Sequence, residues 1–179
     1  MSEAQIRAYA ETKAFHAQTL ERWLTWQEAD REPLLGLVIG LKIGENHLRD
    51  LMDWLEEIAL RDKTPIAEVL STKPIGDIAS DPRLGRADKL KRIKEQIRRR
   101  RFPRLAQTED EISGRIKDLQ LAPEIRLSVP PGLETGRLHV EFSAATHDEL
   151  IRLTNKLAQA VQQDAARTVF KLLGGNSAV

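Results

Sequence analysis

The chain has 179 residues, of which 41% are apolar and 31% are charged, a balance that fits one folded domain or two small ones and excludes a long disordered tail. Aromatic residues make up 4%, so the core must consist mainly of Leu, Ile, Val and Ala, and an all-β fold is disfavoured. The sequence contains no cysteine, which excludes disulfides, thiolate zinc sites, iron–sulfur clusters and a cysteine nucleophile.

The net charge of +1 conceals an uneven distribution. Residues 83–104 carry eleven Lys or Arg residues and two acidic residues, a local charge of +9, so the rest of the chain carries −8. A concentrated positive segment attracts polyanions even when the whole molecule is nearly neutral. The distribution therefore says more about partners than the net charge does.

The sequence gives no sign of a membrane span or of export. No uninterrupted apolar run approaches the roughly 20 residues that a membrane helix needs. The first residues, MSEAQIRAYAETK, lack the apolar centre of a secretory signal. We therefore expect a cytoplasmic protein without membrane contact.

The first part of the chain is predicted to be helical. Apolar residues recur at three- and four-residue steps over 3–29, which predicts one helix bounded by Asp30 and Pro33. The apolar segment 34–43 favours a core helix, with a buried strand as the alternative. A regular apolar stripe over 45–62 predicts an amphipathic helix.

Shorter elements lead to the basic segment. Thr64 followed by Pro65 is typical of a helix start, with the Thr64 hydroxyl as the cap, and predicts a short helix to Leu70. Residues 71–82 contain two prolines and predict a turn-rich internal boundary. The helix that follows covers 86–101, and its apolar side consists of Leu90, Ile93 and Ile97.

Beyond the basic helix the periodicity changes from helix to strand. Pro103 interrupts the helix, and a further helix with a Thr108–Glu111 capping box continues to about Leu121. Two segments then alternate apolar and polar residues and predict a hairpin with one dry face, 124–129 and 137–142.

The chain ends in two predicted helices. Thr146 and Glu149 form a capping box that opens a helix, and its apolar stripe, which is expected to cover the hairpin, consists of Leu150, Leu153, Leu157 and Val161. A final short helix from about Ala165 is expected to stop at Gly174 and Gly175, with residues 176–179 frayed.

These elements predict a mainly α fold with a small α+β C-terminal module in the order α-β-β-α. The expected parts are a helical N-terminal domain, basic connecting helices, and a hairpin-plus-helix dimerisation module, at 1–80, 81–121 and 122–179.

A two-stranded sheet is marginal in water and has two unpaired edges. Two copies that pair one edge about a two-fold axis would form a four-stranded sheet, so we expect a homodimer, with a monomer covered by its own helices as the alternative. The expected interface consists of Ile125, Leu127, Leu138, Val140, Phe142, Leu150, Leu153 and Leu157.

The stretch 111–157, EISGRIKDLQLAPEIRLSVPPGLETGRLHVEFSAATHDELIRLTNKL, resembles the C-terminal dimerisation module of ParB-type partition proteins. That module has a helix, a strand, a Gly-containing hairpin, a second strand and a helix, and a basic linker precedes it. The resemblance implies dimerisation and association with DNA, and it suggests that 34–82 takes the place of the family's helix-turn-helix region. The family's nucleotide-binding signature has no counterpart in this sequence, so its CTP switch is not implied.

The basic segment is the main candidate for a binding site, and we expect it to project outward and to neutralise roughly 4 to 6 phosphates. The candidate nucleic-acid-binding residues are Lys89, Lys91, Arg92, Lys94, Arg98, Arg99, Arg100, Arg101 and Arg104. Two alternatives remain for this segment, pairing with the chain's own acidic residues, such as those at 50–57, and docking on an acidic protein. A different function, a protein-interaction adaptor, would use the apolar region 34–60 or the basic helix.

No pattern in the sequence predicts catalysis, a metal or a cofactor. His47 and Asp50 can share one helical face, but a metal site needs three or four ligands and a polar cluster at the helix start is the alternative. The acidic residues Asp50, Asp53, Glu56 and Glu57 are spaced as a solvated helix face. No histidine forms a recognisable triad, and no Gly-rich phosphate loop occurs.

Overall fold

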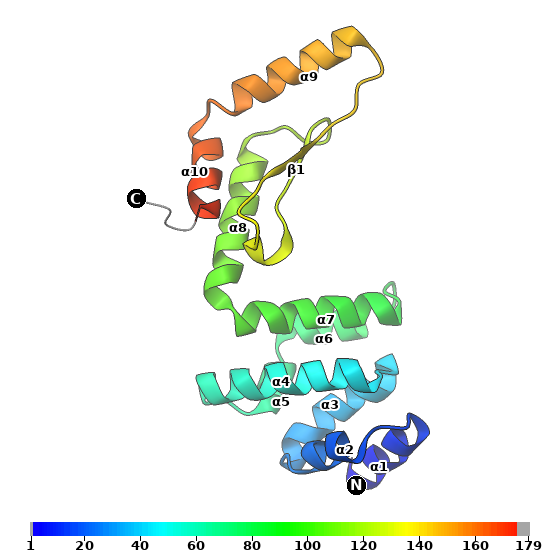
Figure 1. Ribbon diagram of the computed structural model, residues 1–179. Helices are drawn as coiled ribbons and strands as arrows, with labels where there is room; N and C mark the ends of the chain where they lie inside the picture. The colour runs from blue at the N-terminus through cyan, green and yellow to red at the C-terminus, as the bar shows by residue number, and fades with distance from the viewer. Residues whose placement is uncertain (1, 175–179) are drawn as a thin grey trace. The chain divides into compact units, whose positions relative to one another are not determined.

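The computed structural model describes residues 2–174, and over that range it contains ten α-helices and one two-stranded antiparallel sheet (Figure 1). The predicted fold class, mainly α with a small α+β module, is confirmed. The chain divides into two compact units, 1–102 and 103–179, which are described separately. No helix within residues 2–174 combines the length and the apolar character that a membrane crossing requires.

The first unit consists of seven helices among the described residues. Their bounds are α1 Ser2–Thr12, α2 Ala17–Leu24, α3 Glu28–Leu41, α4 Glu45–Asp62, α5 Ile66–Leu70, α6 Lys73–Ser80 and α7 Arg86–Arg101. They enclose one core built largely from aliphatic side chains, as the low aromatic content predicts. Its fully buried members include Ile6, Trp23, Leu34, Leu48, Met52, Leu55, Ile58, Ile93 and Ile97.

The prediction of one helix over 3–29 is wrong, because the chain breaks twice in this range. Ala14 takes a left-handed conformation with φ of 52°. The Glu45 carboxylate then accepts hydrogen bonds from the His16 amide at 3.1 Å and the Thr19 hydroxyl at 2.5 Å. The contact between α2 and the start of α4 brings Trp23 into the same core as Ile6.

Asp30 and Pro33 do not mark a boundary but lie within α3. The segment favoured as helix from residue 34 is helical as far as Leu41. Asp30 instead caps a helix far from it in the sequence. Its carboxylate accepts a hydrogen bond from the Ala67 amide, in the first turn of α5, at 2.8 Å. The predicted cap, Thr64, makes no such bond, and its buried hydroxyl has no partner among the described residues.

The helices α4 and α7 have the predicted bounds, whereas the predicted boundary at 71–82 is largely helix α6. Pro74 lies in the first turn of α6, where the missing amide costs no hydrogen bond. Helix α7 packs against α4 and α6 (Figure 1), with Ile93 and Ile97 each 1% exposed. The chain therefore divides after Phe102 instead of at the expected positions 80 and 121.

The second unit contains α8 Pro103–Asp118, β1 Arg126–Ser128, a 3₁₀ turn at Pro131–Leu133, β2 His139–Glu141, α9 His147–Ala160 and α10 Asp164–Leu173. The predicted hairpin is confirmed, with shorter strands paired in the register Arg126 to Glu141, Leu127 to Val140 and Ser128 to His139. The predicted Thr108–Glu111 capping box is wrong, because α8 already begins at Pro103 and the Thr108 hydroxyl donates to the Arg104 carbonyl. The predicted end at Gly175 and fraying of 176–179 lie outside the described residues.

The capping box at α9 is confirmed. The Thr146 hydroxyl accepts a hydrogen bond from the Glu149 amide at 3.1 Å, and the Glu149 carboxylate accepts one from the Ala145 amide at 2.8 Å. At the turn of the hairpin, Gly136 has a φ of +58°, and a Cβ on this residue would lie 3.2 Å from the Leu173 carbonyl oxygen. This position therefore favours glycine on two grounds.

The apolar face of the hairpin packs at both ends. Ile125 and Phe142 join a cluster with Leu153 of α9. Val129 and Leu138 join a second cluster that includes Ile112 of α8 and Val169 and Leu173 of α10. The predicted lid, α9, therefore covers one end of this face, and Val140 near its middle remains 44% exposed.

The place of α7 in the first core gives a prediction. Replacing Ile97 by Ala should destabilise the first unit by about 2–5 kcal/mol, because it leaves a cavity between packed helices. All three tryptophans lie in this unit, so tryptophan fluorescence during urea unfolding reports on it. The exposed Lys91→Ala variant of the same helix is the control, and equal midpoints for the two variants would show that α7 is not part of the core.

Candidate nucleic-acid interface

The acidic face of α4 pairs with cations from two other helices. Asp50 lies 2.7 Å from the Lys94 ammonium, and Glu57 lies 2.6 Å from the Arg101 guanidinium, so two of these pairs join α4 to α7. Arg22 of α2 pairs with the remaining two acidic residues of the 50–57 cluster, Asp53 at 2.7 Å and Glu56 at 2.6 Å.

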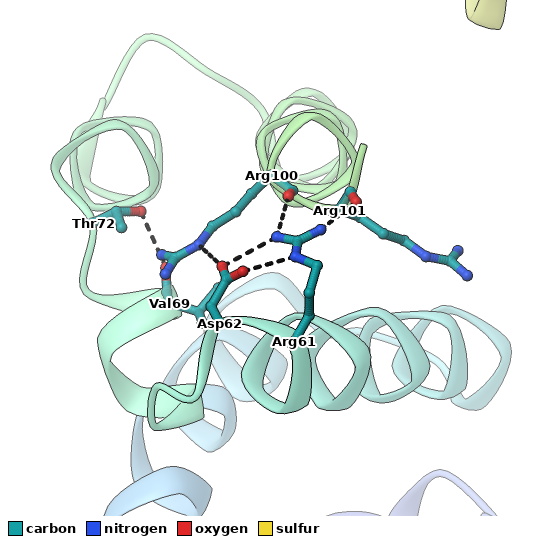
Figure 2. Close-up of polar contacts among 6 residues, drawn as sticks. All are labelled: Arg61, Asp62, Val69, Thr72, Arg100 and Arg101. Carbon is teal, nitrogen blue, oxygen red and sulfur yellow. Dashed lines mark hydrogen bonds and ion pairs between the residues drawn. The ribbon is translucent and has the colours of Figure 1, made fainter. Parts of the chain in front are cut away.

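The C-terminal end of α7 is fixed by a guanidinium from α4 (Figure 2). Arg61 donates hydrogen bonds to the carbonyl oxygens of Arg100 at 2.8 Å and Arg101 at 2.5 Å, which have no partner within their own helix. Asp62 accepts a hydrogen bond from Arg61 at 2.7 Å and pairs with Arg100 at 3.5 Å. The guanidinium group of Arg61, and to a smaller extent that of Arg100, holds the pKa of Asp62 below its ordinary value of 3.8.

Other cations of the basic segment also have partners within the chain. Lys89 donates to the Ala79 carbonyl of α6 at 2.8 Å. Arg98 makes two hydrogen bonds of 2.8 Å to Glu95, which lower the pKa of that carboxyl. Arg99 also has a polar partner. For much of the segment, the expectation of cations that project outward without neutralisation is therefore wrong.

The structure thus divides the nine candidate residues into three groups. Lys91 and Arg92 are exposed on α7 and have no ion pair within residues 2–174. Arg86, the first residue of this helix, is also exposed and has no ion pair within that range. Arg104 is exposed in the second unit, at the start of α8. The others contact protein groups, and for Lys94 and Arg101 the partners are the 50–57 carboxylates, the intramolecular alternative considered above.

A groove of about 380 Å³ lies between α4 and α7. The apolar side chains that line it are Trp54, Ala87 and Leu90. The charged and polar side chains that line it, called its rim below, are His47, Lys91, Lys94, Glu95 and Arg98. The Lys94 ammonium lies 4.9 Å from the centre of the Trp54 ring, within the range of a cation–π contact. Sequence reasoning did not select Trp54, although this aromatic residue flanks the apolar stripe of α4.

His47 and Asp50 both lie next to the ammonium group of Lys94 and, among the described residues, not beside further metal ligands. Asp50 binds Lys94, and the His47 Nδ1 atom lies 3.5 Å from the same ammonium. Within residues 2–174 no group of three or more His, Cys, Asp or Glu residues is placed to hold a metal ion.

The apolar segment 34–60, the docking region of the adaptor alternative, lies mostly in the first core. Its buried residues include Leu34, Val38 and Leu55, and among its large hydrophobic residues Ile39 and Leu60 are exposed, at 44% and 83%. Most of its apolar surface is therefore used within the unit.

The residues expected at a dimer interface differ in how exposed they are in the structure. Ile125 and Leu153 are each 1% exposed, so their own unit covers them and they cannot line an interface in this conformation. The partly buried members are Leu127, Leu138, Phe142 and Leu157. Val140 and Leu150 are each 44% exposed, and Ile151, which is not among the predicted residues, is 47% exposed.

The contacts of Asp62 predict an acid-dependent loss of stability. Replacing Asp62 by Asn should destabilise the first unit at neutral pH, because it removes the charge that binds Arg61 and Arg100. A lowered carboxyl pKa adds stability above its unfolded value of 3.8, and this contribution is lost as the pH falls through the folded value. The deficit should therefore shrink in acid.

Urea unfolding at neutral and at acid pH measures this difference. Asp77→Asn is the matched control, because Asp77 is exposed on α6 and has no ion pair within residues 2–174. A deficit of constant size across the pH range would contradict the electrostatic role of Asp62.

Comparisons with protein-family models, with curated proteins and with solved structures found no match. The resemblance to the ParB-type dimerisation module therefore stays a prediction from the sequence.

Proposed function

We propose that this protein is a non-catalytic nucleic-acid-binding protein that contacts phosphates through the solvent face of α7. The observation that supports the proposal is that the adjacent residues Lys91 and Arg92 are exposed on α7, away from its buried Ile93 and Ile97, and have no ion pair within residues 2–174. A helix face of this kind binds a phosphate backbone without the cost of breaking an internal salt bridge.

The paired cations of α7 form a second, weaker source of charge. Lys94 and Arg101 retain 20% and 28% side-chain exposure, and ion pairs that contact solvent contribute about 0–1 kcal/mol. Phosphates can therefore compete with Asp50 and Glu57 for these cations. The helix stays in place during such an exchange, because its buried Ile93 and Ile97 hold it to the core.

Phosphate contacts position a protein on nucleic acid but do not read its sequence, so we expect little base specificity from this face. DNA is the expected partner, since the ParB resemblance implies association with DNA. The cytoplasmic location predicted from the sequence belongs to the same proposal.

Loss of the two exposed cations at the middle of α7 tests the proposal. The double variant Lys91→Gln/Arg92→Gln should weaken binding to a short labelled DNA duplex and flatten the dependence of log K on log salt by about 0.9 for each phosphate contact removed. The unfolding midpoint should not change, because neither side chain has an ion pair within the described residues.

The matched control is Arg126→Gln/Arg137→Gln, which removes the same charge from two exposed positions of the second unit. If binding depends on α7, this control keeps most of the affinity and the salt slope. Equal losses in the two double variants would show that binding follows net charge, and the proposed site on α7 would be discarded.

We propose in addition that two copies associate through their second units. The sheet has two strands within residues 2–174, so each strand keeps one unpaired edge. Leu150 and Ile151 of α9 and Val161, the residue that follows α9, are 44–47% exposed, and a groove of about 550 Å³ lies beside β1. The residues on this side of α9 carry no charge, so two identical faces do not repel each other.

Self-association predicts a change in mass. The wild-type chain should have the mass of a dimer in light scattering, and Leu150→Glu should shift it toward the monomer, because two copies would bring like charges together on an apolar face. Gln159→Glu adds the same charge at an exposed position on another side of α9 and should stay dimeric. A wild-type chain that is monomeric at every concentration tested would contradict the dimer.

An adaptor that docks through 34–60 would have little exposed apolar surface to use in this segment. Most of the large apolar side chains of that segment lie in the first core.

A further inference from the structure

We propose that the groove between α4 and α7 holds a nucleotide unit of a single strand, with its base against Trp54 and its phosphates on the cationic rim. The inference rests on the proposed function and deepens it, because it assigns a base contact to a surface so far described by phosphate contacts alone. The groove has a volume of about 380 Å³ and lies within the first unit.

Trp54 is the aromatic residue of this groove. The other two tryptophans are buried, Trp23 at 0% and Trp26 at 9% exposure, whereas Trp54 is half-buried and lines the groove. Every nucleobase has a flat face that stacks on an aromatic side chain, so a ring in this position binds bases without reading their identity.

Lys94 covers part of the Trp54 ring. Its ammonium lies 4.9 Å from the ring centre and binds Asp50 at 2.7 Å. A base that stacks on this part of the ring must move the ammonium aside, and the ion pair with Asp50 gives it a partner when it moves. Stacking therefore does not leave a cation without a counter-charge.

The rim supplies the contacts that the backbone of the strand requires. Lys91 is exposed beside the groove and has no ion pair within residues 2–174, and Arg98 lines the same rim. Phosphates that follow the stacked base can thus bind the cations of the proposed phosphate-binding face of α7.

A single strand fits this arrangement better than either of two other anionic ligands. In a duplex the faces of the bases are stacked inside the helix, so the duplex offers its phosphates but not a base for Trp54. An acidic peptide without aromatic residues offers carboxylates to the rim, but it has no flat ring to stack on Trp54.

The test compares three labelled probes of equal length with the full chain: oligothymidylate, an abasic strand and a duplex. Binding is measured by probe anisotropy, and stacking is measured by quenching of tryptophan fluorescence. Oligothymidylate should quench the fluorescence and bind roughly 5- to 150-fold more tightly than the abasic strand, the range expected for one stacked base. The abasic strand should bind without quenching.

Substitution of Trp54 separates stacking from the phosphate contacts. Trp54→Leu should lower the affinity for oligothymidylate to that of the abasic strand and leave the affinity for the duplex unchanged, which also shows that the variant is folded. Trp54→Phe keeps a ring and should retain most of the affinity for oligothymidylate.

Three results would overturn the inference. If all three probes bind equally and Trp54→Leu has no effect, the groove is not a base site, while the phosphate-binding function stands. If free thymidine monophosphate quenches at the same concentration as oligothymidylate, the ligand is not a strand. If no probe binds, the proposed function and this inference both fail.

Discussion

The contact between α4 and α7 is the constraint on which the first unit depends. Ile93 and Ile97 pack into the core on one side of α7, and ion pairs with Asp50 and Glu57 flank this apolar seam. Arg61 adds hydrogen bonds to the last carbonyl groups of α7. Burial supplies most of the free energy of such a contact, whereas solvent-exposed pairs add little and mainly fix where the long side chains lie. The packing of one helix thus decides which cations remain available to a partner.

Charge that is clustered in the sequence is distributed differently in space. Residues 83–104 carry a local charge of +9, but the helix that contains most of them packs beside an acidic helix about 40 residues earlier in the chain. The carboxylates of α4 then neutralise part of α7 and leave a smaller cationic face. Counting charges along a segment therefore overestimates the field that a nucleic acid meets, because the count omits neighbours that only the fold supplies.

Local patterns predicted much of the fold, and contacts between distant residues account for the rest. The stripes of α4 and α7, the hairpin and the Thr146 cap depend on residues close together in the sequence, and these predictions are confirmed. The break before α2 depends on Glu45, and the cap of α5 depends on Asp30, in each case a residue about 30 or more positions away. The same division holds for the candidate site. The basic helix could be predicted from local composition, whereas its ion partners and the groove at Trp54 depend on the packing of α4 on α7.

The hairpin turn of the second unit limits how this sequence can change over evolutionary time. Gly136 combines a positive φ with a backbone carbonyl 3.2 Å from the position of a Cβ. Asparagine, the usual substitute at a left-handed position, tolerates the positive φ, but its Cβ would still lie too close to the carbonyl oxygen. Among homologues this residue should change more slowly than its exposed neighbours, even though it lies outside the proposed binding site. An invariant glycine at this turn would therefore record how the chain is built and would be a poor guide to what it binds.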